Sequence, residues 1–259
     1  MKELKILCWN VNGVRAVGRK GFLQWLDEAS PDIICLQETK AHPEQLECEL
    51  KEPQGYSAYW NYPEEARGYS GVATLTREKP LRVENGFGIP KFDQEGRTII
   101  TQYPQFTLLN VYFPNGKKDE IRLKYKMDFY DVFLKFVDQL QGRGEKLIVC
   151  GDFNTAHKEI DLARPKENGS VSGFLPMERE WMDEFVTHGF VDAFRYFSKE
   201  PNQYTWWDLK SRARERNVGW RLDYFFITEN LMKSVSKAFI MSEVMGSDHC
   251  PVGVILKIA

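Results

Sequence analysis

The chain has 259 residues, of which 42% are hydrophobic and 28% charged, a composition typical of a globular protein with one large domain or two small ones. Its formal net charge of −2 excludes a uniformly basic coat, so any nucleic acid must be held by a local basic patch. No apolar run approaches the ~18 residues that span a membrane. The chain begins a strand almost at once, which leaves no room for a signal peptide, and its five cysteines include no Cys-x-x-Cys pair. We therefore expect a cytoplasmic protein with reduced thiols.

The first elements predict a strand–helix–strand unit. Residues 4–10 have the pattern of a buried strand. Apolar side chains recur at helical spacing over residues 22–29, and Pro31 ends that helix. A second buried strand, residues 32–36, is followed by the polar residues 37–40. This length fits a crossover between two parallel strands.

The rest of the chain predicts short strands, a long amphipathic helix and further strand-rich segments. A basic loop covers residues 210–216, and no repeat or linker interrupts the chain, so we expect one domain over residues 1–259. The remaining predicted elements are strands at residues 56–62, 70–76, 97–103, 106–112, 147–150, 204–207, 222–228 and 252–258, and helices at residues 119–141 and 177–187.

Residues 147–154 (LIVCGDFN) place polar side chains at the end of a buried strand. Gly151 is expected to turn the chain, and the two-residue spacing puts Asp152 and Asn154 on one side of it. Taken alone, the stretch favours an ordinary turn. Ligand sites in α/β folds lie at strand ends, however, and several other predicted strand ends are polar as well. These residues are Asn10, Asn12, Glu38, Tyr112, Asn115, Asp223, Asp248 and His249.

A cluster of carboxylates at these strand ends would repel itself without a cation. A bound divalent metal is the natural counter-charge, and hard oxygen ligands favour Mg²⁺, with Mn²⁺ as a substitute, over zinc. One acid or base contributes about 10²–10⁴-fold to a rate, whereas enzymes lower barriers by ~8–23 kcal/mol. Phosphodiester hydrolysis therefore needs a metal, a water activator and groups that stabilise charge on the phosphate, and this set of residues could supply all three.

Four motifs resemble those of the exonuclease III family of apurinic/apyrimidinic endonucleases, within the endonuclease/exonuclease/phosphatase superfamily. They are PDIICLQETK (residues 31–40), GDFN (151–154), NVGWRLDY (217–224) and GSDHCP (246–251), and the resemblance runs from about residue 4 to residue 257. It implies a four-layered α/β sandwich, in which two β-sheets pack face to face and are flanked by helices. Ala193 and Thr228 stand where the family pattern usually has Ser or Thr and Ser, respectively, and neither touches the expected chemistry.

The resemblance also implies a metal site and a water-activating group. Glu38 resembles the principal metal ligand, with Asn12 and Asp248 as further ligands, direct or through water. Asp152 matches the residue that activates the attacking water or protonates the leaving oxygen. Asn154 would orient that water or the phosphate, and Asp152 and Asn154 are also candidate metal ligands.

The same resemblance assigns three groups around the scissile phosphate. His249, held by Asp223, would contact the phosphate. Tyr112 would donate a hydrogen bond to it or act as a phenolate, and Asn10 would help to set the site.

DNA binding is expected from basic side chains that interleave with aromatic ones. A charge run is usually a solvated surface, and each Trp could equally be core. By resemblance, Trp206, Trp220 and Leu222 would line a pocket for a flipped-out sugar without a base, which is cheap to extrude because its pairing and stacking are already lost. The full set of candidate DNA contacts is Lys40, Asn115, Lys117, Lys118, Lys210, Arg212, Trp206, Trp220 and Leu222.

The predicted function is a Mg²⁺-dependent DNA repair endonuclease, acting as a monomer on duplex DNA. It would cut 5′ to an abasic site, leave a 3′-hydroxyl and a 5′-deoxyribose phosphate, and trim damaged 3′ ends as 3′→5′ exonuclease or 3′-phosphodiesterase. The alternative is a deoxyribonuclease I-like nuclease, which resembles a design with a second catalytic histidine, or another metal-dependent phosphoesterase of the superfamily. The other histidines here are His42, His157 and His188. A DNA-binding protein without catalysis is a third interpretation, which metal-dependent turnover would exclude.

Overall fold

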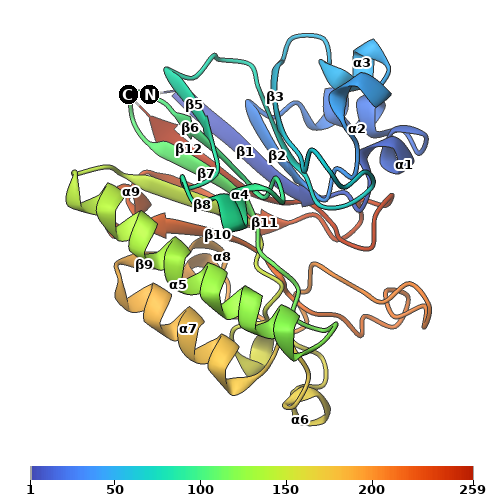
Figure 1. The fold of residues 1–259 in the computed structure, drawn as a ribbon, viewed down its shortest axis with the longest axis vertical. Helices are drawn as coiled ribbons and strands as arrows, with labels where there is room; N and C mark the ends of the chain where they lie inside the picture. The colour runs from blue at the N-terminus through green and yellow to red at the C-terminus, as the bar shows by residue number, and fades with distance from the viewer. Residues whose placement is uncertain (1, 259) are drawn as a thin grey trace.

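The structure, a computed structural model that describes residues 2–258, contains two six-stranded β-sheets packed face to face (Figure 1). The strands are β1 (Lys2–Asn10), β2 (Ile33–Gln37), β3 (Ser57–Asn61), β4 (Val72–Thr76), β5 (Arg82–Asn85), β6 (Thr98–Gln102), β7 (Thr107–Tyr112), β8 (Leu147–Asp152), β9 (Phe190–Asp192), β10 (Asp223–Thr228), β11 (Val235–Ile240) and β12 (Val252–Ile258). The first sheet has the order β11-β12-β1-β2-β4-β3 and the second β5-β6-β7-β8-β10-β9. Each sheet holds one parallel pair, β1–β2 or β7–β8, among antiparallel neighbours.

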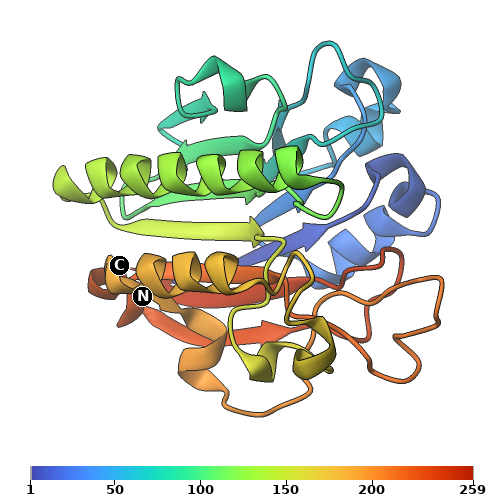
Figure 2. The same cartoon turned by 60° about the horizontal axis from the view of Figure 1, so that its bottom comes forward.

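Helices cover the outer faces of the sheets, which confirms the predicted four-layered α/β sandwich. In Figure 2, α5 and α7 lie side by side over the second sheet, and the N-terminal helices lie against the first. The α-helices are α1 (Val14–Gly18), α2 (Phe22–Ala29), α3 (Cys48–Lys51), α4 (Pro90–Asp93), α5 (Glu120–Gly142), α6 (Pro165–Asn168), α7 (Pro176–Thr187), α8 (Ala193–Phe197) and α9 (Glu229–Met232), and the 3-10 turns are η1 (Pro43–Gln45) and η2 (Glu159–Asp161). Within residues 2–258, no helix has the length and apolarity that a bilayer crossing requires.

Strand alternation explains why both faces of β1 are buried. Ile6 and Cys8 point into the core between the two sheets, whereas Leu7 and Trp9 point outward into the cluster that contains Phe22 of α2. Successive side chains of a strand face opposite sides, so a strand covered on both faces has a continuous apolar sequence. The predicted crossover is confirmed: β1 and β2 are parallel, with Asn10 opposite Gln37.

The long helix α5 packs an aromatic stripe against the second sheet. Asp119 caps its N-terminus, because the Asp119 carboxylate accepts a hydrogen bond from the Arg122 backbone N–H at 2.7 Å. Phe129 and Phe133 are fully buried in this stripe. The same buried face also contains a charged residue, Lys126.

Several sequence-based boundaries differ from the structure. Residues 204–207 were expected to form a strand, but Trp206 makes only isolated bridges to Trp220 and His249. The strands β5, β9 and β11 were not predicted, since β9 has only three residues and β5 and β11 are partly exposed, so their apolar pattern is weak. Strand β8 was expected to end at residue 150 with a turn at Gly151, but it continues through Gly151 to Asp152.

Candidate active site

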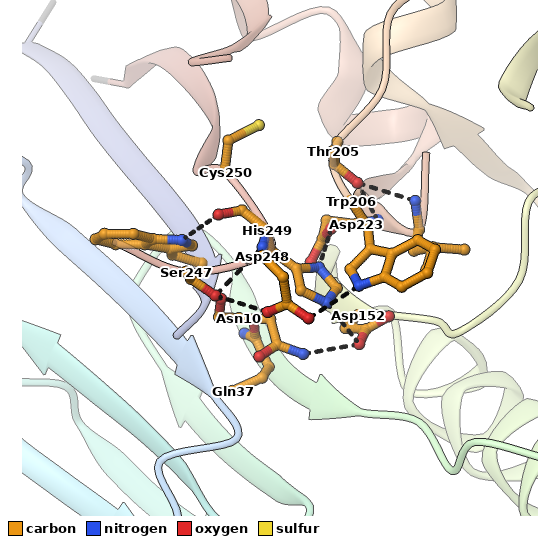
Figure 3. Close-up of polar contacts among 12 residues, drawn as sticks. Asn10, Gln37, Asp152, Thr205, Trp206, Asp223, Ser247, Asp248, His249 and Cys250 are labelled. Carbon is orange, nitrogen blue, oxygen red and sulfur yellow. Dashed lines mark hydrogen bonds and ion pairs between the residues drawn. The ribbon is translucent and has the colours of Figure 1, made fainter. Parts of the chain in front are cut away.

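Sheet register brings the polar strand ends together at one edge of the sandwich. Strands β7 and β8 are parallel, and Tyr112 lies beside Asp152 at their carboxyl ends. Strand β10 runs antiparallel to β8, so its first residue, Asp223, lies opposite Asp152. Asn10 at the end of β1 reaches the same point from the other sheet (Figure 3). Four strands from two sheets therefore deliver their polar ends to one place.

Gly151 makes this close approach possible. Its φ of +148° lies where side chains are disfavoured, and a Cβ on residue 151 would lie 1.7 Å from the Val111 carbonyl oxygen. Asn154 follows with a φ of +52°, an uncommon conformation for a residue with a side chain. The backbone here is shaped for the position of Asp152 and Asn154.

Asp152 is a buried carboxylate held by amides. Its Oδ2 accepts a hydrogen bond from Asn10 Nδ2 at 2.8 Å, and its Oδ1 accepts from the Asn154 backbone N–H at 2.8 Å. Asn10 Nδ2 also donates to Glu38 Oε1 at 3.0 Å, so one amide bridges two carboxylates. Burial raises the pKa of Asp152 to about 7, and although His249 opposes the rise, Asp223 and Glu38 add to it. Asp152 can therefore exchange a proton near neutral pH.

His249 is paired with Asp223, as the resemblance implied. Its Nδ1 lies 2.8 Å from Asp223 Oδ2, and its Nε2 lies 3.9 Å from Asp152 Oδ2. Burial alone would lower the pKa of His249, but Asp223, with Asp152 and Asp248, raises it to about 10. The ring is therefore charged at neutral pH, and its second N–H faces Asp152.

The expected metal ligands gather around a lysine ammonium. Lys40 Nζ lies 2.7 Å from Glu38 Oε2 and 2.5 Å from Asn12 Oδ1, so a cation already fits between these oxygens. Burial alone would raise the pKa of Glu38, but Lys40 and Asn10 outweigh it, and the net pKa is below its ordinary value. Asp248 adjoins these groups, and its oxygens accept from Asn12 Nδ2 at 2.9 Å and from Trp206 Nε1 at 3.0 Å.

The expected metal ligands include a small set of oxygen donors, Glu38 and Asn12. Among residues 2–258, no group of three or more His, Cys, Asp and Glu side chains could hold a metal ion. Mg²⁺ typically keeps several waters and binds through one or two carboxylates. Glu38 and Asn12 offer one carboxylate and one amide oxygen, so the residues present fit a hydrated magnesium ion.

An aromatic wall adjoins the polar groups. The rings of Trp206 and Trp220 meet edge to face, with an interplanar angle of 82° and centroids 6.3 Å apart. Lys117 lies across both, with its Nζ 4.9 Å from the Trp206 centroid and 5.1 Å from the Trp220 centroid. The site cavity has a volume of about 300 Å³. Its lining includes Lys40, Asn115, Lys117, Trp206, Trp220 and Leu222.

The candidate DNA contacts divide into those that line the cavity, named above, and those that lie outside it. Lys118, Lys210 and Arg212 are exposed and do not line the cavity. Two arginines of the basic stretch have structural partners instead: Arg214 donates to the carbonyls of Ser242 and Val244, and Arg221 is buried against Asp161 and Asp192. The net basic surface of this stretch is therefore smaller than its sequence indicates.

Three supporting residues were missed from the sequence. Arg97 packs its guanidinium 4.6 Å from the centre of the Tyr112 ring and donates to the Tyr112 carbonyl at 3.0 Å. Ser247 Oγ lies within hydrogen-bond distance of two acceptors, the Asn10 carbonyl at 2.9 Å and Asp248 Oδ1 at 3.1 Å, and its one proton serves one of them at a time. Gly173 lines the cavity from a distant loop. The position of Ser247 beside Asp248 was a usable signal, but nothing local in the sequence marks Arg97 or Gly173.

Comparison with known proteins places the chain among nucleases. The profile of the endonuclease/exonuclease/phosphatase family matches residues 7–249. The chain is 43% identical over 257 residues to an exodeoxyribonuclease of Bacillus subtilis, covering 98% of this chain and 100% of that protein. It is 40% identical over 258 residues to the DNA repair nuclease APEX1 of Danio rerio, covering 99% of this chain and 83% of that protein.

Two solved structures have the same fold. The AP endonuclease LMAP of Leishmania major superposes with a TM-score of 0.87 at 29% identity, over 100% of this chain and 89% of that one. The 3′ phosphatase NExo of Neisseria, bound to a product DNA hairpin, superposes with a TM-score of 0.90 at 26% identity, over 98% of this chain and 100% of that one.

Proposed function

The chain belongs to the endonuclease/exonuclease/phosphatase family, as its four motifs predicted, and from this we propose a specific activity. We propose that it incises DNA on the 5′ side of an abasic site. It is a DNA repair nuclease, and the proposal concerns its substrate and chemistry. Incision would hydrolyse the phosphodiester and leave a 3′-hydroxyl and a 5′-deoxyribose phosphate. The observation that carries the proposal is the position of Asp152 and His249 beside a cavity walled by Trp206 and Trp220.

Asp152 is proposed as the group that takes a proton from the attacking water. Its pKa of about 7 suits proton transfer near neutral pH. Asn10 and Asn154 hold its two oxygens, so the carboxylate is oriented before the substrate arrives. Asn115 Nδ2 donates to Asn154 Oδ1 at 2.8 Å, which leaves the Asn154 amide fixed next to Asp152.

Two hydrogen-bond donors are proposed to bind the phosphate. His249 carries a positive charge at neutral pH and is fixed by Asp223, so its Nε2–H can stabilise charge on a phosphate oxygen. Burial raises the pKa of Tyr112 well above 10, and this favours the neutral phenol, a donor, over the phenolate. Arg97 holds the Tyr112 ring from behind.

Mg²⁺, with Mn²⁺ as a substitute, is proposed to bind to Glu38 and the Asn12 side-chain oxygen. When bound, it would supply positive charge that stabilises the phosphate oxygens and the leaving oxygen. Lys40 would have to give up its contact with Glu38, and its ammonium would then be free for a DNA phosphate.

The aromatic wall supports a preference for abasic sugars. Trp206, Trp220 and Leu222 present an apolar surface to the cavity, which suits the face of a sugar without its base. A volume of about 300 Å³ is at the lower end of ligand pockets, so a base would compete for space with the Trp rings.

A duplex with one abasic site tests the proposal. We expect incision with Mg²⁺, no incision with EDTA, and loss of at least about 10²-fold in rate for Asp152→Asn, because the amide cannot accept the water proton. Asp183→Asn is a matched control, since Asp183 contacts His157 outside the cavity. Incision that survives EDTA, or that Asp152→Asn leaves intact, would contradict the mechanism.

A second activity, removal of blocked 3′ ends, is also proposed. Similar proteins include an exodeoxyribonuclease and a 3′ phosphatase. A nicked duplex with a 3′-phosphate should lose its phosphate at the same site, so Asp152→Asn should abolish both activities together.

The deoxyribonuclease I-like alternative gains no support from the histidines. His249 is the one histidine among the residues that line the cavity. His157 pairs with Asp183, His188 with Asp138, and His42 packs 4.6 Å from the Tyr62 ring. An undamaged duplex should therefore be a much poorer substrate than an abasic one.

A further inference from the structure

A fully buried ion pair lies beneath the site and connects two segments that are distant in sequence. Lys126 of α5 and Glu178 of α7 are both 0% exposed, and Lys126 Nζ lies 2.6 Å from Glu178 Oε1. Neither residue lines the site cavity. The groups that they hydrogen-bond, however, belong to residues that line the cavity: Asn154 on the catalytic side and Gly173 on the side of the Trp rings.

The lysine end holds the backbone that follows Asp152. Lys126 Nζ donates to the Asn154 carbonyl at 2.8 Å and to Thr155 Oγ1 at 2.8 Å, so with Glu178 all three of its protons are used. One helical turn later, Tyr130 donates to the Phe153 carbonyl at 2.7 Å, and its hydroxyl oxygen lies 2.9 Å from Thr155 Oγ1. Helix α5 therefore fixes residues 153–155, including the uncommon conformation of Asn154.

The glutamate end holds the loop that carries part of the cavity wall. Glu178 Oε2 accepts from the Gly173 N–H at 2.6 Å and from the Leu175 N–H at 3.0 Å, and Oε1 accepts from Ser172 Oγ at 2.9 Å. Gly173 lines the cavity, and the neighbouring Phe174 ring lies edge-on to Trp220 with centroids 6.5 Å apart. The Glu178 carboxylate thus fixes the position of the loop that forms this part of the cavity wall.

Stability alone does not explain this pair. Removing two charges from water is expensive, and a well-packed apolar pair in the same place is often equally stable or more so. A polar network that satisfies every member does, however, specify one arrangement of the segments it joins. The arrangement fixed here is the position of Asn154 relative to the wall at Gly173.

We propose that Lys126 and Glu178 are positioning residues for the reaction: together with Tyr130 they hold the Asp152–Asn154 corner in register with the aromatic wall that receives the sugar. This inference rests on the proposed function. It goes beyond that function by assigning a catalytic consequence to groups that never touch the substrate. A displacement of about 1 Å in a reacting group can lower a rate by about 10²-fold.

The double variant Lys126→Met/Glu178→Gln separates positioning from folding. The introduced glutamine can still accept from the Gly173 and Leu175 N–H groups, so the wall is kept, while the introduced methionine gives the Asn154 carbonyl no donor. In single-turnover incision of an abasic duplex we expect a maximal rate lower by about 10- to 100-fold, with the half-saturating enzyme concentration within about threefold of the unmodified protein. Lys91→Met/Asp128→Asn neutralises an exposed pair between α4 and α5 and should leave both quantities unchanged.

Tyr130→Phe is the second variant, and it buries no unpaired charge. It should lower the maximal rate by about 3- to 10-fold without changing half-saturation, because it frees Phe153 and Thr155. A folded double variant would overturn the proposal if its maximal rate stayed within about twofold of the unmodified protein, or if only its affinity for DNA fell. If the double variant does not fold, full activity of Tyr130→Phe would overturn the proposal. If the unmodified protein leaves abasic DNA intact, the proposed function fails instead, which keeps the two failures distinct.

Discussion

Among its neighbours, Asp223 contributes most to the charge of His249. Burial in a protein interior lowers the pKa of a histidine, yet the 2.8 Å contact with Asp223 reverses this and fixes the ring. Asp152, at 3.9 Å from the other ring nitrogen, adds to the same effect. At the residue scale, the site is a chain of groups in which each one sets the charge or the direction of the next.

Asp223→Asn should therefore slow incision without removing a group that touches the substrate. The neutral amide cannot compensate the positive charge of the imidazolium, so the charged form of His249 is less stable and its ring is held less firmly. We expect the single-turnover rate on an abasic duplex to fall by about 10- to 10³-fold. A rate within about twofold of the unmodified protein would show that His249 needs no partner.

Surface cations should affect affinity and not chemistry. Lys210 and Arg212 are exposed and lie outside the cavity lining. Lys210→Ala/Arg212→Ala should weaken binding to any duplex and reduce the slope of log affinity against log salt by up to about 2. Lys124→Ala, an exposed site on α5, is the control. An unchanged salt slope, measured by fluorescence anisotropy, would remove this loop from the DNA-binding surface.

At the scale of elements, the parallel strands β7 and β8 can pair at Gly151 only because glycine has no side chain. The backbone of residue 151 approaches Val111 too closely for any Cβ. Gly151→Ala should lower the free energy of unfolding by about 3 kcal/mol or more, from backbone strain and overpacking together. Urea denaturation measures this directly.

Gly142→Ala provides the matched control for that change. Gly142 ends α5, and a Cβ there would meet no atom within 4 Å. The substitution should be neutral or stabilising by up to about 1 kcal/mol. If both variants have the same stability, the tight contact at Gly151 has no energetic consequence.

How much of the molecule the sequence could predict varies with the element. Continuous apolar runs with polar ends identified β1, β2 and β8, and with the motifs they pointed to Glu38, Asp152 and Asp223. The aromatic run at residues 204–207 predicts a strand, because aromatic residues favour strands, but its backbone is shaped by contacts with Trp220 and His249. Lys126 sits among aromatic residues of a helix and has no local signal, since its partners lie 28 and 52 residues away. Burial of a charge is decided by tertiary contacts that periodicity does not contain.

At the scale of the whole molecule, a second buried ionic network links three separate segments of the second half of the chain, around residues 161, 195 and 221. Asp161 accepts hydrogen bonds from Arg221 at 2.8 Å and from Arg195 at 2.7 Å. Burial alone would raise the pKa of Asp161, but the two arginines hold it at about 2, below its ordinary 3.8. The folded state therefore favours the ionised carboxylate.

This shift predicts a loss of stability in acid. A depressed folded-state pKa means that the unfolded chain binds more protons between about pH 4 and pH 2, so stability rises with pH in that window. Asp161 should contribute about 2 kcal/mol that is fully present above about pH 4 and is lost as the pH falls to about 2. Asp161→Asn should be less stable at neutral pH and have a flatter profile below about pH 4. Parallel profiles for the two proteins would contradict this assignment.

The central claim is that water attacks the phosphate on the 5′ side of an abasic site, with Asp152 taking its proton. Incision in ¹⁸O-labelled water, with mass spectrometry of both fragments, tests it most directly. We predict one ¹⁸O atom in the 5′-deoxyribose phosphate, none in the fragment that ends in a 3′-hydroxyl, and no product from Asp152→Asn. A fragment that ends in a 3′-unsaturated aldehyde, or a 5′-phosphate without ¹⁸O, would contradict the account.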